Sequence, residues 1–193
     1  MPDGDDSRVL SVISSISDMA SEKWDACAGT DNPFMSHAFL SALEDSGSAN
    51  EEMGWIPRHI IVEAPDGHVE ACAPIYLKTH SYGEYVFDWG WADTYERAGG
   101  RYYPKLQCAA PFSPVPGPRL LIDCNLDAAS QDELRRILLS GITRVAEQLK
   151  VSSAHITFCN EHEWKLGGDL GYLQRIGQQF HWHNHGYQTF DDF

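Results

Sequence analysis

Side chains that can move protons gather in two stretches of this 193-residue chain. In the first, Asp88, Asp93 and Glu96 precede Lys105, and a carboxylate near an attacking group can act as a general base. We take Asp88 as one candidate catalytic residue. Each of these carboxylates can equally be a surface or capping group, which is the commoner role for such a residue.

The second stretch holds three alternating histidines, His181, His183 and His185. On a β-strand they would share one face, and this spacing can present two imidazoles to one metal ion. A polar strand face or a catalytic histidine is the commoner outcome, so we predict no metal site and take His181 as the second candidate base. Further metal ligands, if any, would come from His155, Cys159, Glu161 and His162.

Aromatic rings and prolines are concentrated between Tyr85 and Leu120. Five prolines, at positions 104, 111, 114, 116 and 118, each fix a φ angle and remove a backbone donor. We therefore expect a stiff, ordered loop in the second half of this stretch. Rings beside such a loop either line a ligand groove or fill a core, and the residues leave both interpretations open.

Composition excludes some functions. The formal charge of -14 repels phosphate backbones, so no broad nucleic-acid surface is expected. The five cysteines include no C-x-x-C pair and are expected to be reduced thiols. The acidic N-terminus is unlike a signal peptide, and no apolar run is long enough to span a membrane. These features predict a soluble, cytoplasmic protein.

Local patterns predict the elements of the first half. Residues 1–16 resemble a disordered tail, followed by one helix over Ser17–Ala28 and another from Asn32-Pro33 to Ser46-Gly47. Two β-rich runs, 58–64 and 69–77, flank the turn sequence Pro65-Asp66-Gly67 and predict a hairpin. Alternating rings over 85–91 predict a third antiparallel strand with Asp88 on the face opposite the rings.

The second half combines helices with strands. The apolar stripe from Gln131 to Leu149 predicts a long helix with a capping box at Ser130 and Glu133. A short strand over 154–159, a helix capped by Asn160 and a long strand from Tyr172 to about Asn184 follow. We predict an α/β (α+β) fold with one mixed, largely antiparallel sheet flanked by helices.

The last residues have the pattern of a helix start, with Thr189 as N-cap and Asp191 and Asp192 in the first turn. We interpret 17–188 as one domain and 189–193 as the start of a helix leading into a further part of the protein. The alternative is an unstructured tail that has a cap-like sequence.

Three signatures together resemble the FemAB-like family of predicted N-acyltransferases within the GNAT acyltransferase superfamily: VFDWGWADTYERAGGRYYPKL, APFSPVPGPRLL and QQFHWHNHGYQTFDDF. The resemblance implies a GNAT-like mixed sheet and a second, missing GNAT-like C-terminal half as a partner of this one. It also implies transfer of an acyl or aminoacyl group to a small-molecule or peptide amine, with acetyl-CoA, acyl-CoA or an aminoacyl carrier as donor. The glycine-rich loop that usually binds the CoA pyrophosphate is not found in this chain.

An acceptor groove would need hydrogen-bonding and stacking side chains beside the base. The candidate substrate-binding residues are Trp91, Asp93, Tyr95, Tyr103, Lys105, Phe112, Ser113, Trp182 and Asn184. The alternative function is a noncatalytic domain that recognises a cell-wall peptide or glycan through the same rings. A metal hydrolase built on the histidines is a distant third possibility.

Overall fold

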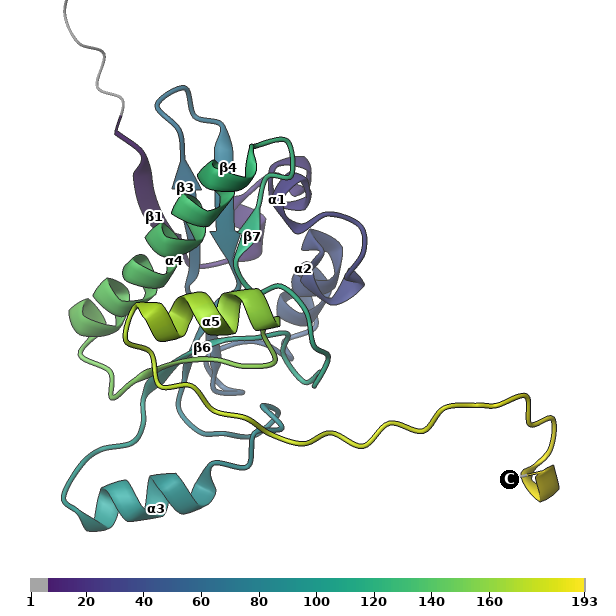
Figure 1. Cartoon of the computed structure of the whole chain (residues 1–193). Coiled ribbons are helices and arrows are strands. Elements are labelled where there is room, and N and C mark those ends of the chain that lie inside the picture. Colours follow the sequence, from purple (N-terminus) through teal and green to yellow (C-terminus); the bar gives the residue numbers. More distant parts are fainter. Residues whose placement is uncertain (1–6, 193) are drawn as a thin grey trace, which may run out of the picture.

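The protein is described by a computed structural model that covers residues 7–192 (Figure 1). Two four-stranded sheets form its centre. The first sheet has the order β1 (Val9–Ile13), β3 (His59–Glu63), β4 (Val69–Ala73) and β7 (Leu121–Ile122), all antiparallel. The second has the order β2 (Trp55–Pro57), β5 (Ile75–Lys78), β6 (Lys105–Cys108) and β8 (Ala154–Ile156), in which only β6 and β8 are parallel. The predicted mixed, largely antiparallel α/β fold is confirmed, with two sheets in place of one.

Helices cover both faces of the first sheet (Figure 1). The α-helices are α1 (Ser21–Ala28), α2 (His37–Asp45), α3 (Trp89–Arg97), α4 (Ala128–Leu149) and α5 (Glu161–Asp169). Three short 3-10 helices are η1 (Ile16–Asp18), η2 (Pro33–Met35) and η3 (Phe190–Asp192). No helix within residues 7–192 is long and apolar enough to cross a membrane.

Strand β3 shows how the sequence builds these layers. Ile60 and Val62 belong to the core cluster that includes Leu138 of α4, whereas Ile61 belongs to the cluster that includes Trp24 of α1. Successive side chains of a strand point to opposite faces, so an unbroken apolar run is what a strand between two helical layers requires. Each such fully buried side chain contributes about 1.5–3 kcal/mol.

The long helix α4 begins three residues earlier than its apolar stripe. The side chain of Asp127 accepts hydrogen bonds from the backbone N–H groups of Ala129 and Ser130, so Asp127 is the N-cap. The predicted capping box at Ser130 and Glu133 is therefore wrong, because Ser130 already lies inside the first turn. Glu133 instead forms an ion pair with Arg8.

The predicted strand over residues 85–91 is also wrong. Tyr85 and Phe87 have φ angles of 58° and 54°, which lie in the left-handed region and are incompatible with a strand. The helix α3 starts directly afterwards at Trp89. The rings alternate along the chain, but Tyr85, Phe87, Trp89 and Trp91 are all largely exposed, so no core favours an extended register.

Both ends of the chain differ from expectation. Residues 9–13, predicted to lie in the disordered tail of residues 1–16, form β1 because Leu10 packs against the core; residues 1–6 lie outside the described residues. The predicted strand over 172–184 does not form: the chain there runs away from the body (Figure 1), and Ile176 and Phe180 are about nine-tenths exposed. A strand needs a neighbour to pair with, and this segment has none among the described strands.

The remaining differences are smaller. The run 69–77 is split at Pro74 into β4 and β5, which belong to different sheets. The proline-rich stretch is a loop from 109 to 120, but β6 precedes it as a central strand directly after Pro104. The segment expected as a helix start at Thr189 contains the three-residue 3-10 helix η3.

Candidate functional site

The second sheet has one apolar and one polar face. Ile75, Leu77, Leu106 and Cys108 belong to or pack against the same core cluster as α4. The other face carries the polar side chains of β5 and β6, in which Tyr76 pairs with Gln107 and Lys78 with Lys105. All four of these polar residues are fully buried: Tyr76, Lys78, Lys105 and Gln107. We call this the polar face.

The segment between β5 and β6, residues 79–104, supplies an ionic cluster to this face. We call this segment the arm; it contains α3. The Lys105 Nζ donates to Glu84 Oε2 at 2.7 Å and to Asp88 Oδ2 at 2.6 Å, and also to Ser81 Oγ at 3.0 Å. Tyr102 donates its hydroxyl to the same Asp88 oxygen at 2.6 Å. One ammonium therefore holds two carboxylates of the arm against the sheet.

Backbone and ring contacts hold the first residues of the arm, which follow β5. Lys78 Nζ lies 3.7 Å from the centroid of the Trp55 ring and donates to the Tyr82 carbonyl at 3.2 Å. The Trp55 indole N–H donates to the same carbonyl at 3.1 Å. Phe112, from the proline-rich loop, packs on Trp55 with ring centroids 5.2 Å apart. A Cβ at Gly83 would lie 2.6 Å from the Phe112 ring, so this contact requires glycine.

Burial and pairing give these groups different pKa values. Burial alone would raise the pKa of Asp88, but its hydrogen bonds, led by that from Lys105, outweigh burial and hold the pKa at about 2. Burial raises the pKa of Glu84, and Lys105 offsets this only in part. Burial lowers the pKa of Lys78 to about 7 and that of His155 to about 4. Of the pKa values of about 2, 4 and 7 for Asp88, His155 and Lys78, that of Lys78 lies nearest to neutral pH.

Four buried side-chain atoms have no hydrogen-bond partner within the described residues: Tyr76 Oη, Glu84 Oε1, Asp88 Oδ1 and Gln107 Oε1. All four belong to the polar face or to the carboxylates that contact it. Three of them are acceptor oxygens and the fourth is a hydroxyl. An unsatisfied buried polar atom costs about 1–3 kcal/mol, so their grouping in one place indicates a site for a donor-rich ligand.

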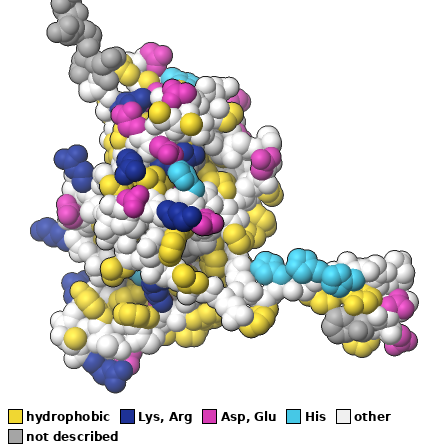
Figure 2. Space-filling view, viewed as in Figure 1, with side chains coloured by type: hydrophobic (Ala, Val, Ile, Leu, Met, Phe, Trp, Pro, Cys, Tyr) yellow, Lys and Arg dark blue, Asp and Glu magenta, His cyan; other side chains and the backbone are white. Residues whose placement is uncertain are grey.

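The outer surface of the arm is aromatic. Phe87, Trp89, Trp91 and Tyr95 are each about half exposed or more, and several hydrophobic side chains are visible on the part of the molecule where α3 lies (Figure 2). Arg175 of the C-terminal segment stacks over the Trp91 ring at 5.2 Å. Exposed rings of this number are uncommon on a surface that binds nothing.

The structure brings three predicted site residues together. Asp88 and Lys105 are ion-paired, and the Tyr103 hydroxyl lies 2.7 Å from Ser81 Oγ at the edge of the same cluster. Asp88 is not on a strand face opposite the rings, as expected, but at the N-cap position of α3 with its side chain buried. Phe112 lies nearby, on Trp55, and Ser113 follows it in the loop.

The other predicted residues lie outside the cluster. Trp91, Tyr95 and Asp93 are on the exposed side of α3, where Asp93 pairs with Arg97. The C-terminal segment carries His181, Trp182 and Asn184, all exposed; its histidines form a row along it (Figure 2). His181 lies 3.3 Å from Gln179 Oε1, and Asn184 Oδ1 accepts from two backbone N–H groups of its own turn. Residues 7–192 contain no group of three or more potential ligands placed to hold a metal ion.

Sequence reasoning missed half of the cluster. Glu84, Ser81 and Lys78 were not selected, and neither were Tyr76 and Gln107. A signal was present, because Tyr76 and Lys78, and likewise Lys105 and Gln107, alternate with apolar residues in short strands. Polar residues at period two beside apolar ones mark a strand with two different faces.

Fold and site together define a mixed α/β protein with a buried ionic cluster under an aromatic arm. Its sequence matches the FemAB-like family, described as peptidoglycan biosynthesis/recognition, over residues 15–193. The chain therefore belongs to the FemAB-like family. No curated protein matches it.

Proposed function

We propose that this protein transfers an acyl or aminoacyl group to an amine acceptor bound at the polar face. The family, which is generally related to acyltransferases, supports the reaction class. In the reaction the amine nitrogen forms a bond to the acyl carbon, and the bond from that carbon to the sulfur or oxygen of the donor breaks. The donor is an acyl-CoA, acetyl-CoA included, or an aminoacyl carrier, and the amine loses a proton in the step.

The observation that carries this proposal is the set of unpaired acceptor atoms. Glu84 Oε1, Asp88 Oδ1 and Gln107 Oε1 are buried acceptors without a donor among residues 7–192. An amine or ammonium group offers two or three donors from one atom and matches such a set. The site already binds one ammonium in this way, that of Lys105.

The pKa values indicate which group could accept the proton that the amine loses. A base operates best when its pKa lies near the working pH. Asp88, with a pKa of about 2, is better suited to orienting a cationic amine, whereas Lys78, with a pKa of about 7, is matched to accepting its proton. Because both are fully buried, the acceptor reaches them only when the arm moves.

Binding of a lysine-containing peptidoglycan stem peptide tests the amine site. Isothermal titration compares the peptide with its Nε-acetylated form, which keeps the shape and loses the ammonium. The free amine should bind at least about tenfold more tightly, since a charge-assisted hydrogen bond contributes about 1.5–3 kcal/mol. Equal affinity of the two peptides would rule out the amine site. Mass spectrometry of the peptide after incubation with acetyl-CoA, and separately with aminoacyl-tRNA, then tests transfer.

The exposed rings of α3 support a second candidate, noncatalytic recognition of a cell-wall peptide or glycan. Trp89 is 55% exposed and Trp91 64%, and indole faces stack well on sugar rings and peptide groups. In this case a glycan fragment binds through the arm without any transfer. Loss of glycan binding in Trp91→Ala, with no transfer detected from either donor, would favour recognition over catalysis.

A further inference from the structure

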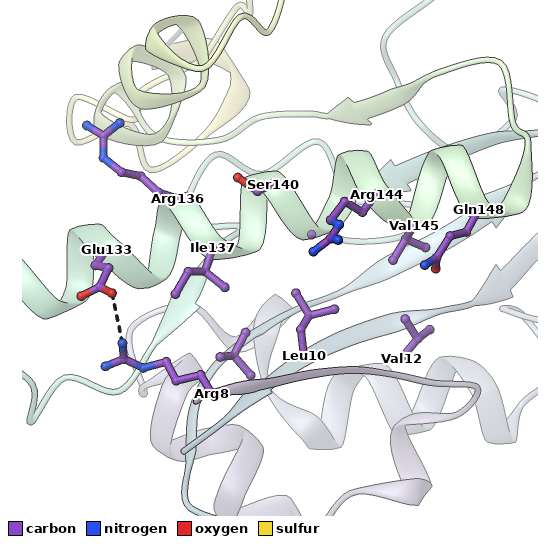
Figure 3. Close-up of a pocket in the computed structure, with 12 residues that line it drawn as sticks. Arg8, Leu10, Val12, Glu133, Arg136, Ile137, Ser140, Arg144, Val145 and Gln148 are labelled. Carbon is purple, nitrogen blue, oxygen red and sulfur yellow. Dashed lines mark hydrogen bonds and ion pairs between the residues drawn. The ribbon is translucent and has the colours of Figure 1, made fainter. Parts of the chain in front are cut away.

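A groove of about 880 Å³ lies between the edge strand β1 and the helix α4 (Figure 3). Its floor is apolar and includes Leu10 and Val12 of β1 and Ile137 and Val145 of α4. In Figure 3 Leu10 and Val12 of the strand point toward Ile137, Arg144 and Val145 of the helix, whereas Arg136 and Ser140 point away from the strand. The volume falls in the range of ordinary ligand sites.

The strand that forms one wall is an unprotected sheet edge. In the described sheet, β1 pairs with β3 alone, over five residue pairs and without a register shift. Its outward backbone groups can therefore pair with another chain. Val9 is 55% exposed and Val12 42%, and the strand carries none of the lysines, prolines or bulges that usually block an edge.

The helix that forms the other wall carries two arginines along the groove. Arg144 points toward the strand and Arg136 lies at the outer rim, pointing away from it (Figure 3), and neither forms an ion pair within residues 7–192. Arg8 also lines it and is held by Glu70 and Glu133. The chain as a whole has 28 acidic and only 14 basic residues, so two unpaired arginines beside one apolar groove make a local exception.

Spacing matches the two arginines to an added strand. Arg136 and Arg144 are eight residues apart on α4, which corresponds to about 12 Å along a helix. Residues i and i+4 of a strand are about 13 Å apart and lie on the same face. A strand added beside β1 would direct every second side chain to the α4 side, as β1 directs Arg8, Leu10 and Val12.

From this geometry we propose that the groove binds an extended acidic peptide, which adds to the free edge of β1 and places alternate carboxylates against Arg144 and, once its side chain swings in from the rim, against Arg136. Main-chain hydrogen bonds to β1 give affinity, and the arginines and the apolar floor give specificity. The proposal is independent of acyl transfer, because none of the groove residues belongs to the polar face or the arm.

Fluorescence anisotropy with a labelled nine-residue peptide in which Val and Glu alternate tests this proposal. The peptide should bind the intact chain, and Arg136→Ala with Arg144→Ala should weaken binding at least about tenfold. Arg97→Ala with Arg101→Ala, which removes two exposed arginines of the arm, is the matched control and should leave affinity unchanged. A Val–Lys peptide should not bind.

Two further measurements test whether the peptide pairs with the backbone of β1 and whether a second copy of the chain occupies this edge instead. The same peptide with the amides of one edge N-methylated should lose binding, and hydrogen exchange of the β1 amides should slow when the unmodified peptide is present. Equal binding of the Val–Lys or N-methylated peptide overturns the proposal. So does a dimer, seen by sedimentation, whose formation protects the β1 amides and excludes the peptide, because the edge would then belong to a second copy.

Discussion

Two buried charged clusters in this molecule differ in how completely their hydrogen bonds are satisfied. In one, Glu163 accepts from the backbone N–H groups of Arg119 and Leu120 at 2.9–3.0 Å. The Arg119 guanidinium donates to four backbone carbonyls, those of Val115, Gly117, Pro118 and Thr157. This cluster holds the proline-rich loop, and none of its side-chain atoms is among the unpaired ones within the described residues.

The cluster around Lys105 is equally buried, but two carboxylate oxygens there have no partner among residues 7–192, Glu84 Oε1 and Asp88 Oδ1. A satisfied buried network fixes structure, whereas an unsatisfied one retains binding capacity at a cost in stability. The comparison therefore separates a charge cluster whose hydrogen bonds are satisfied from the one that the proposed function uses. It also predicts that matched substitutions will have different consequences in the two places.

The largest difference should come from isosteric Glu→Gln substitutions. Glu163→Gln keeps one oxygen as acceptor for the two N–H groups, but it turns an NH2 group toward the N–H of Arg119 at the Oε2 position and removes the charge near Arg119, so it should destabilise the protein by about 3 kcal/mol. Glu84→Gln should cost about 1 kcal/mol or less, because Glu84 accepts a hydrogen bond only from Lys105, which still pairs with Asp88. Urea denaturation measures both. Equal losses would mean that both clusters are structural.

A glycine pair tests how firmly the arm is seated. Gly83 and Gly67 have similar φ angles, 78° and 82°, so alanine strains the backbone equally at both. Only at Gly83 would the new Cβ meet a neighbour, the Phe112 ring at 2.6 Å. Gly83→Ala should therefore cost about 1–3 kcal/mol more than Gly67→Ala in thermal or urea unfolding. An equal loss of unfolding free energy in the two variants would show that the arm shifts away from Phe112 without a penalty.

The pH dependence of stability reports on Lys78. Burial lowers its folded pKa to about 7 from an ordinary 10.5, so between these pH values the unfolded chain binds more protons. This group therefore makes stability rise as pH increases through that window. Urea denaturation at pH 7 and pH 9.5 should show the rise in the wild type and a smaller one in Lys78→Met. Lys23→Met, at an exposed lysine, is the control and should keep the wild-type slope.

The sequence predicted the elements that depend on local signals. The hairpin of β3 and β4 and α5 with its Asn160 cap lie where turns, caps and periodicity place them. The predicted helix after Asn32 is confirmed as α2, but it starts later, at His37 after the Ser36 cap, because Asn32 caps the short 3-10 helix η2 instead. The arm was mispredicted because its conformation depends on ion pairs between residues 17 and 21 positions apart, Asp88 and Glu84 with Lys105. For the same reason Asp88 and Lys105 could be selected one by one, but not as partners.

The smallest effect on stability should come from the rings of α3, where the recognition hypothesis makes its strongest prediction. Trp91 is 64% exposed, so Trp91→Ala should change the free energy of unfolding by no more than about 0.5 kcal/mol. If the arm binds a glycan or peptide, the same substitution should weaken that binding at least about tenfold, as loss of a stacking ring does at interfaces. Leu173→Ala, at a 93% exposed position of the C-terminal segment, is the control. Unchanged binding in Trp91→Ala would leave the ionic cluster beneath the arm as the sole candidate for contact with the acceptor.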